Sequence, residues 1–197
     1  GLDEFASIGY SNYNAFEAQV QKTYGGGITF QLAYTFSKSI SDTDNSRDNL
    51  DVVNPRITRG LSSQDVPHRF VGSWVYQLPF AKNLSAPLRR FLDGWSVGGI
   101  VTFQSGTPFS VSNASSTADG TGGAVISYAD LGAEYRQMDP RKNDGRAFNA
   151  DAFASFSVAD ADLATDYRRG TSRRNQFRLN NGINNWDLII SKKTQLW

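Results

Sequence analysis

The sequence predicts an all-β fold: a transmembrane antiparallel β-barrel, of which the chain holds about five strands joined by long loops. Three observations lead to this prediction. Segments of about nine to ten residues alternate apolar and polar side chains, which is the period of a strand and the length that crosses a bilayer. Long and shorter connections between these segments alternate along the chain. Aromatic residues gather near both ends of the apolar strand faces, as at a membrane interface.

The strands are predicted over 14–22, 28–37, 69–78, 95–104 and 184–192. The second of them, "ITFQLAYTF", alternates without interruption. Because successive strand side chains point to opposite faces, each segment has one apolar face and one face of mainly small or polar residues. The residues predicted to face lipid are Phe16, Phe30, Leu32, Tyr34, Phe36, Phe70, Trp74, Tyr76, Trp95, Val97, Val101, Phe103, Trp186, Leu188 and Ile190.

The connections differ in length in a regular way. The segment "TYGGG" predicts a tight hairpin, because its glycines adopt positive φ without steric cost. A long polar loop follows over 38–68, then a medium connection over 79–94, then a very long loop over 105–183. In an antiparallel sheet the long loops therefore lie at one end. Outer-membrane barrels have this asymmetry, whereas a soluble sandwich has no reason to sort its loops by end.

The aromatic residues support a membrane sheet over a soluble one. With the long loops outside, one group falls near the outer interface and a second near the inner one. A soluble core rich in aromatic residues is the alternative. The opposite faces carry small side chains that favour a lumen wall over a second packed core: Ala33, Ser73, Ser96 and Gly98. The aromatic residues predicted near the outer interface are Tyr34, Phe36, Phe70, Phe103 and Trp186, and those near the inner interface are Tyr76 and Trp95.

Composition excludes several classes of protein. The 197 residues include 20 Lys+Arg and 19 Asp+Glu, so a net charge of +1 gives no general attraction to nucleic acid. Mean hydropathy is −0.44, and no apolar run approaches the roughly 20 residues of a transmembrane helix. Cysteine is absent, which excludes disulfides and thiolate chemistry. The opening "GLDEFASIGY" resembles the middle of a longer sequence rather than a signal peptide.

No motif in the sequence predicts catalysis, a cofactor or a metal site. The only histidine, His68, has no cysteine or acidic cluster beside it, so we expect it where a loop enters the barrel rim. Hydrolase, zinc-protease and phosphate-loop motifs do not occur. The stretch 41–51 offers Asp42, Asp44 and Ser46 for calcium, but Arg47 and Val53 stand where an EF-hand needs glycine and an acid. A solvated loop is the expectation there, with an irregular calcium site as the alternative.

The segment "YRRGTSRRNQFR", residues 167–178, holds five arginines beside aromatic residues. Nucleic-acid binders share this composition, but nearby acids balance the charge. We therefore expect the arginines to pair within the loop, or to contact lipopolysaccharide or an anionic substrate. The balancing acids are Asp151, Asp160, Asp162 and Asp166.

Several segments resemble successive barrel segments of TonB-dependent outer-membrane receptors, in the same order. They are "NYNAFEAQVQKTYGGGITFQLAYTFSKSISD", "LSSQDVPHRFVGSWVYQLPF", "GWSVGGIVTFQSGTPFSV" and "GINNWDLIISKK". The resemblance is closest to the Oar-like subgroup, whose members carry an N-terminal carboxypeptidase-regulatory-like domain; "FNADAFASF" and "GTSRRNQFR" share it. It implies that the chain is a late part of a barrel of about 22 strands, without the plug or the N-terminal domains.

The resemblance also implies a function and a location. Such receptors lie in the outer membrane of Gram-negative cells, where their loops capture a small molecule, glycan or peptide and the TonB system moves the plug. The implied partners are outer-membrane lipid, lipopolysaccharide, the rest of the barrel, the plug and the TonB system, without nucleic acid. Glu17, Gln19, Gln31 and Gln104 are then candidates for lining the ligand path. A soluble all-β binding or adhesion module and a passive barrel without TonB coupling are the alternatives.

Overall fold

The computed structural model describes residues 9–23, 26–44, 58–79, 93–113, 117–118, 124–125, 128–155, 170–179 and 182–194. The chain divides into two compact units. We call Ala15–Phe36, Pro67–Ser105 and Gly182–Trp197 the sheet unit, and Gly1–Asn14, Ser37–Val66 and Gly106–Asn181 the loop unit. Within the described ranges, no helix combines the length and the apolar character that a membrane crossing requires.

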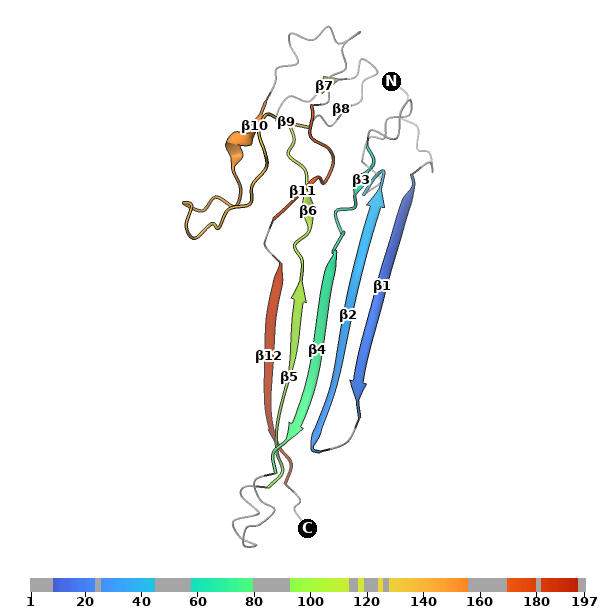
Figure 1. The fold of residues 1–197 in the computed structure, drawn as a ribbon, viewed down its shortest axis with the longest axis vertical. Helices are drawn as coiled ribbons and strands as arrows, with labels where there is room; N and C mark the ends of the chain where they lie inside the picture. The colour runs from blue at the N-terminus through green and yellow to red at the C-terminus, as the bar shows by residue number, and fades with distance from the viewer. Residues whose placement is uncertain are drawn as a thin grey trace. The chain divides into compact units, whose positions relative to one another are not determined.

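Long antiparallel strands form one sheet in the order β1-β2-β4-β5-β12 (Figure 1). The first strand begins at Ser11 rather than at residue 14, and the second continues to Ser41 rather than ending at residue 37. The extension of β2 has a physical cause: the short strand β3, Gly60–Leu61, pairs with Ile40 and Ser41 and keeps them extended. The strands are β1 (Ser11–Lys22), β2 (Ile28–Ser41), β4 (His68–Gln77), β5 (Trp95–Gln104) and β12 (Ile183–Lys192).

The pairing register places the apolar strand positions on one common face. One row across the sheet runs from Phe30 through Trp74 and Gly99 to Leu188. Side chains directly opposite each other on neighbouring strands lie close enough to pack. We call this the apolar face; in these four strands it comprises Ile28, Phe30, Leu32, Tyr34, Phe36, His68, Phe70, Gly72, Trp74, Tyr76, Trp95, Val97, Gly99, Val101, Phe103, Asn184, Trp186, Leu188, Ile190 and Lys192.

Two glycines on the apolar face let larger neighbours lie flat against the sheet. A Cβ added to Gly99 would lie 2.8 Å from Cη2 of Trp74, so the indole occupies the space above the glycine. A Cβ added to Gly72 would lie 3.1 Å from Cγ2 of Val101. Val101, predicted to face lipid, is on this face but only 7% exposed, because it fills the space beside Gly72 between neighbouring side chains.

Much of the rest of the apolar face is open. Leu188 is 68% exposed, Ile190 is 70% exposed and Trp186 is 59% exposed. An open apolar surface of this kind is rare on a soluble monomer, where it marks an interaction site or a membrane contact. The sheet unit therefore needs an apolar surrounding on this face.

The two long connections leave the sheet at the same end. The register aligns Phe36 with His68, and Arg69 with Gln104, which in turn faces Ile183. The chain thus leaves β2 and β5, and returns to β4 and β12, at one end. At the other end, the turn from β1 to β2 includes Gly27 with φ +79°. Gly94, directly before β5, has φ +77°, and its carbonyl accepts a hydrogen bond of 2.8 Å from the N–H of Lys193.

The loop unit is folded, in contrast to the long loops predicted from the sequence. Its short strands pair as β6 (Pro108–Phe109) with β11 (Phe177–Arg178), β9 (Asp130–Leu131) with β10 (Phe153–Ala154), and β7 (Thr117–Ala118) with β8 (Ala124–Val125). A short 3-10 helix, η2, covers Ala150–Ala152.

An aromatic cluster forms the core of the loop unit. Its ring centroids are separated by 4.9 Å to 6.5 Å, the range of favourable aromatic packing. Phe177 is only 3% exposed. The rings pack against one another in a segment that has no strand periodicity of its own. The members of the aromatic cluster are Phe109, Tyr135, Phe148, Phe153 and Phe177.

Candidate functional site

The face of the sheet opposite the apolar face carries the candidates for the ligand path. Gln31 lies there opposite Ser73, and Gln104 lies opposite both Arg69 and Ile183. We call this the mixed face; in β2, β4, β5 and β12 it comprises Thr29, Gln31, Ala33, Thr35, Arg69, Val71, Ser73, Val75, Gln77, Ser96, Gly98, Ile100, Thr102, Gln104, Ile183, Asn185, Asp187, Ile189 and Ser191. The two other candidates, Glu17 and Gln19, are exposed in β1.

The register adds polar residues that sequence reasoning left out of the candidate set. Arg69 shares a row with Gln104, and Asp187 shares a row with Gln31 through Ser73 and Ile100. Asn185 donates a hydrogen bond of 2.8 Å to Asp187. Alternation alone assigns each residue to a face, but only the pairing of strands distant in sequence reveals which polar groups are neighbours.

The mixed face changes character along the strands. The end near the long connections holds Arg69 and Gln104. Nearer the opposite end of the sheet, Val75 and Ile189 flank Gly98, and both are about half exposed, at 49% and 56%. Beyond them the hydroxyl oxygens of Ser96 and Ser191 lie 2.7 Å apart. Along the strands, the mixed face therefore has a polar zone, then an apolar zone, then a second polar zone.

The apolar face has aromatic groups near both of its ends. Near the long connections, the rings of Phe70 and Phe103 are stacked at 6.1 Å, and Trp186 meets Phe103 edge-on at 5.7 Å. Near the opposite end, Nζ of Lys192 lies 5.5 Å from the centroid of the Trp95 ring. Aromatic and cationic side chains with an apolar body and a polar tip are suited to a boundary between lipid and water. Phe16, which is the residue of β1 predicted to face lipid, is 63% exposed.

His68 begins β4, at the rim of the sheet where the sequence placed it. Its Nδ1 lies 2.8 Å from the hydroxyl of Tyr34, and its ring lies 5.2 Å from that of Phe36. These contacts hold the imidazole on the apolar face. Among the residues described by the structure, no three potential metal ligands come together around it or elsewhere.

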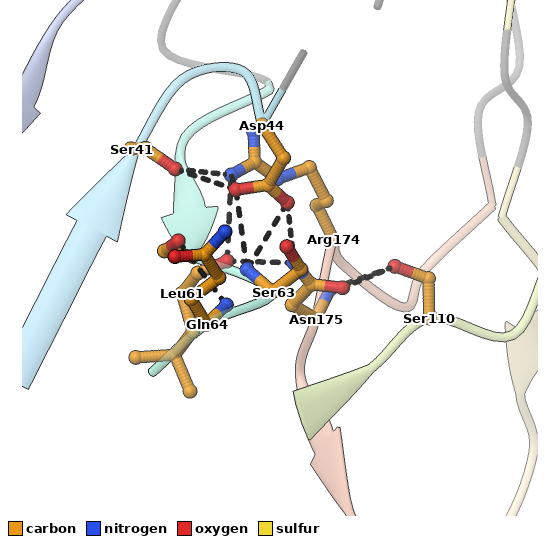
Figure 2. A network of polar contacts seen from close by, with 9 residues as sticks. Ser41, Asp44, Leu61, Ser63, Gln64, Ser110, Arg174 and Asn175 are labelled. Atoms are coloured by element: carbon orange, nitrogen blue, oxygen red, sulfur yellow. Dashed lines mark hydrogen bonds and ion pairs between the residues drawn. The ribbon is translucent and has the colours of Figure 1, made fainter. Parts of the chain in front are cut away.

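A polar network joins distant segments of the loop unit (Figure 2). Its centre is the carboxylate of Asp44, which lies 3.4 Å from Nη2 of Arg174 and accepts hydrogen bonds from the Ser63 N–H and the Ser41 hydroxyl, both at 3.1 Å. The same Nη2 donates to Oγ of Ser41 at 2.6 Å. The carboxylate is therefore already engaged by protein donors, which argues against the calcium alternative at this loop; Ser46 lies outside the described residues.

Asn175 completes this network from a left-handed backbone conformation, with φ +51°. Its side-chain amide donates to Asp44 at 3.0 Å and to the carbonyl of Leu61 at 2.8 Å. Its N–H donates to Oγ of Ser110 at 2.8 Å, and that hydroxyl donates back to the side-chain oxygen at 3.1 Å. Asparagine tolerates this conformation better than most residues, and its four bonds offset the remaining strain.

A second ion pair lies nearby in the loop unit. Nη2 of Arg178 lies 2.5 Å from the carboxylate of Asp65, which also accepts the N–H of Ser39 at 2.6 Å. Nη1 of Arg178 donates to the carbonyl oxygens of Asp65, at 2.8 Å, and Gly106. The carbonyl of Arg178 accepts the Tyr135 hydroxyl at 2.8 Å. Burial raises the pKa of Tyr135 above its ordinary value of 10.0, opposed by a hydrogen bond with Gln137.

These contacts correct the expected pairing of the arginines. Arg174 and Arg178 pair with Asp44 and Asp65, which belong to the other long connection, rather than with acids of their own loop. The physical reason is that the 58–66 segment packs directly on 172–176: a Cβ added to Gly60 would lie 2.4 Å from the carbonyl oxygen of Arg174. Arg168 and Arg169, like Asp160, Asp162 and Asp166, lie outside the described residues.

Comparison with known families adds a decisive observation. The model of a family described as an outer membrane beta barrel domain matches residues 1–197. The chain belongs to this family. Neither the search of curated proteins nor that of solved structures found a match. The sheet described above is therefore part of an outer-membrane β-barrel, and the protein is located in the outer membrane.

Barrel membership explains the edges of the sheet. Within the described strands, β1 and β12 end the order of the sheet and have a neighbour on one side only. In a bilayer every backbone N–H and C=O needs a partner inside the protein, so an open edge is not tolerated. In the closed barrel, the outer edges of β1 and β12 therefore each need a pairing partner.

Proposed function

We propose that this outer-membrane barrel is the wall of a TonB-dependent transporter of the Oar-like subgroup, with the long connections as its ligand-capturing surface. The observation that carries the proposal is that both long connections leave the sheet at one end, and both contribute to a single folded unit. The order of receptor-like segments along the chain supports the same assignment.

The two faces of the sheet receive different roles in this proposal. The apolar face contacts lipid, and its cationic and aromatic ends contact lipopolysaccharide or phospholipid head groups. The mixed face lines the lumen, where Gln31, Arg69 and Gln104 offer hydrogen bonds to a small-molecule, glycan or peptide ligand. We assign no catalytic residue and no cofactor to this wall. The plug and the TonB system act through parts of the receptor that flank this chain.

Genetic epistasis tests the coupling to TonB. Cells lacking the full-length receptor are compared with cells lacking TonB on a panel of glycans and peptides as sole nutrients. We expect the receptor deletion to abolish growth on one nutrient class, and to add no further loss once TonB is removed. If the receptor still supports that growth in cells without TonB, the barrel is a passive pore.

Labelling from outside tests the orientation of the barrel. Because the chain has no cysteine, single cysteines can be introduced at chosen sites. Lys142→Cys, in an exposed turn of the loop unit, should react with a membrane-impermeant maleimide on intact cells. Gly26→Cys, in the turn between β1 and β2, should react only after the outer membrane is opened. The reverse result would place the long connections in the periplasm and remove the capture role.

A further inference from the structure

Two arginines of one long connection each form an ion pair with a carboxylate of the other. Arg174 and Arg178 follow β10, within the 105–183 connection, whereas Asp44 and Asp65 lie within 38–68. The side chains of Arg174 and Asp44 are 9% and 18% exposed, and those of Arg178 and Asp65 are 21% and 3% exposed. Surface ion pairs contribute little to stability, but removal of one partner from a buried pair leaves the other charge without compensation.

Each ion pair is reinforced by bonds that cross between the same two connections. At the first, Asn175 and Arg174 both reach the carbonyl of Leu61, at 2.8 Å and 3.4 Å. At the second, Arg178 binds the side chain and the carbonyl of Asp65 together. Neither connection can retain these partners if the other moves away. The bonds are therefore mutually dependent rather than independent surface contacts.

We propose that Arg174 and Arg178 form a two-point latch that makes the two long connections one cooperative unit. A displacement of either connection, such as one caused by a captured ligand, breaks the buried pairs and releases the other connection as well. The latch does not depend on TonB coupling, because it follows from contacts within the loop unit alone. It assigns a structural role to the "GTSRRNQFR" segment, whose second and third arginines are the latch residues and whose first, Arg173, is exposed.

Hydrogen exchange on the full-length receptor tests the latch, with Arg174→Gln as the variant and Arg173→Gln as its matched control. The two substitutions make the same chemical change at adjacent positions, one buried and one exposed. Arg174→Gln should accelerate exchange by about tenfold or more in peptides covering 58–66 as well as 170–179, because both depend on the buried pair. The Arg173→Gln variant should leave both peptides as in the parent protein.

A reciprocal variant prevents a misfolded protein from being taken as support. Asp65→Asn, in the first connection, should accelerate exchange of the 170–179 peptide in the second. Peptides from β4 and β5 should exchange as in the parent, which shows that the barrel has folded. Acceleration confined to the connection that carries the substitution, in both variants, would overturn the latch. So would equal responses to Arg173→Gln and Arg174→Gln.

Discussion

The sheet unit and the loop unit are stabilised in opposite ways. Backbone ladders join β2, β4, β5 and β12, while the apolar side chains between them stay open, with Leu188 68% exposed. In the described part of the loop unit the ladders are two residues long, and the most buried groups include the polar Asp65, at 2%, and Ser172, at 4%. The sheet unit needs an apolar surrounding, whereas the loop unit encloses its own polar network.

The sheet unit and the loop unit therefore require different surroundings. In lipid, the exposed apolar face of the sheet has an apolar surrounding, so the remaining requirement is that every backbone N–H and C=O is paired. The loop unit has to bury its own core, which it does with the aromatic cluster and with ion pairs. A new charge should therefore damage the apolar face of the sheet, whereas the loss of a charge should damage the loop unit.

The largest expected effect is the loss of a buried carboxylate in the loop unit. Asp65→Ala leaves Arg178 without its counter-charge and the Ser39 N–H without its acceptor. Breaking such a buried pair costs about 3–5 kcal/mol. Protease resistance of the loop unit as a function of urea measures this cost. Asp187→Ala, an exposed acid of the mixed face, is the control and should change stability by no more than about 0.5 kcal/mol.

The second effect tests whether the apolar face meets lipid. Leu32→Arg, in the middle of β2, should destabilise the full-length barrel by about 2–4 kcal/mol in vesicles, and Phe36→Arg, nearer the long connections, by about 0–1 kcal/mol. Gln31→Arg, on the mixed face, should cost little because water surrounds it. Reversible unfolding in lipid vesicles gives these values. Equal losses at positions 32 and 36 would contradict a lipid-facing surface and favour a protein core.

The smallest effect concerns a single hydroxyl of the aromatic cluster. Tyr135→Phe removes the hydrogen bond to the carbonyl of Arg178 but keeps the ring. A typical net contribution of such a bond is about 0.5–1.5 kcal/mol. The midpoint of thermal unfolding of the loop unit should fall accordingly. Tyr13→Phe, at a position 62% exposed in β1, should leave that midpoint unchanged; a similar fall in both variants would mean that the hydroxyl at 135 is not specifically used.

The sheet could be predicted from the sequence because its signal is local. Alternation along "ITFQLAYTF" identifies a strand, and the glycines before it identify a hairpin. The extension of β2 to Ser41 was missed because it depends on pairing with β3, a strand of only two residues. The neighbours Arg69 and Gln104 were not recognised as a pair for a related reason: register is a property of two strands, not of one.

The core of the loop unit could not be predicted, because its aromatic residues do not recur at the spacing of a strand or a helix. Phe109, Phe148 and Phe177 are spread over the long connection among turn residues, and only the folded chain brings their rings together. The partner of Arg174 is 130 residues away, so acids closer in sequence were the natural but incorrect choice. Sequence proximity is a poor guide to ion pairing where two connections fold against each other.

The crossed ion pairs have a consequence for how such receptors diversify. Surface loops usually change length and sequence independently, because each makes few contacts with the others. Here an exchange of the first connection for that of a relative would remove Asp44 and Asp65 and leave the guanidinium groups of Arg174 and Arg178 without these counter-charges. Recombination that breaks the gene between the two connections should therefore be selected against, whereas exchange of both together preserves the fold. We therefore expect the two connections to be inherited as a pair.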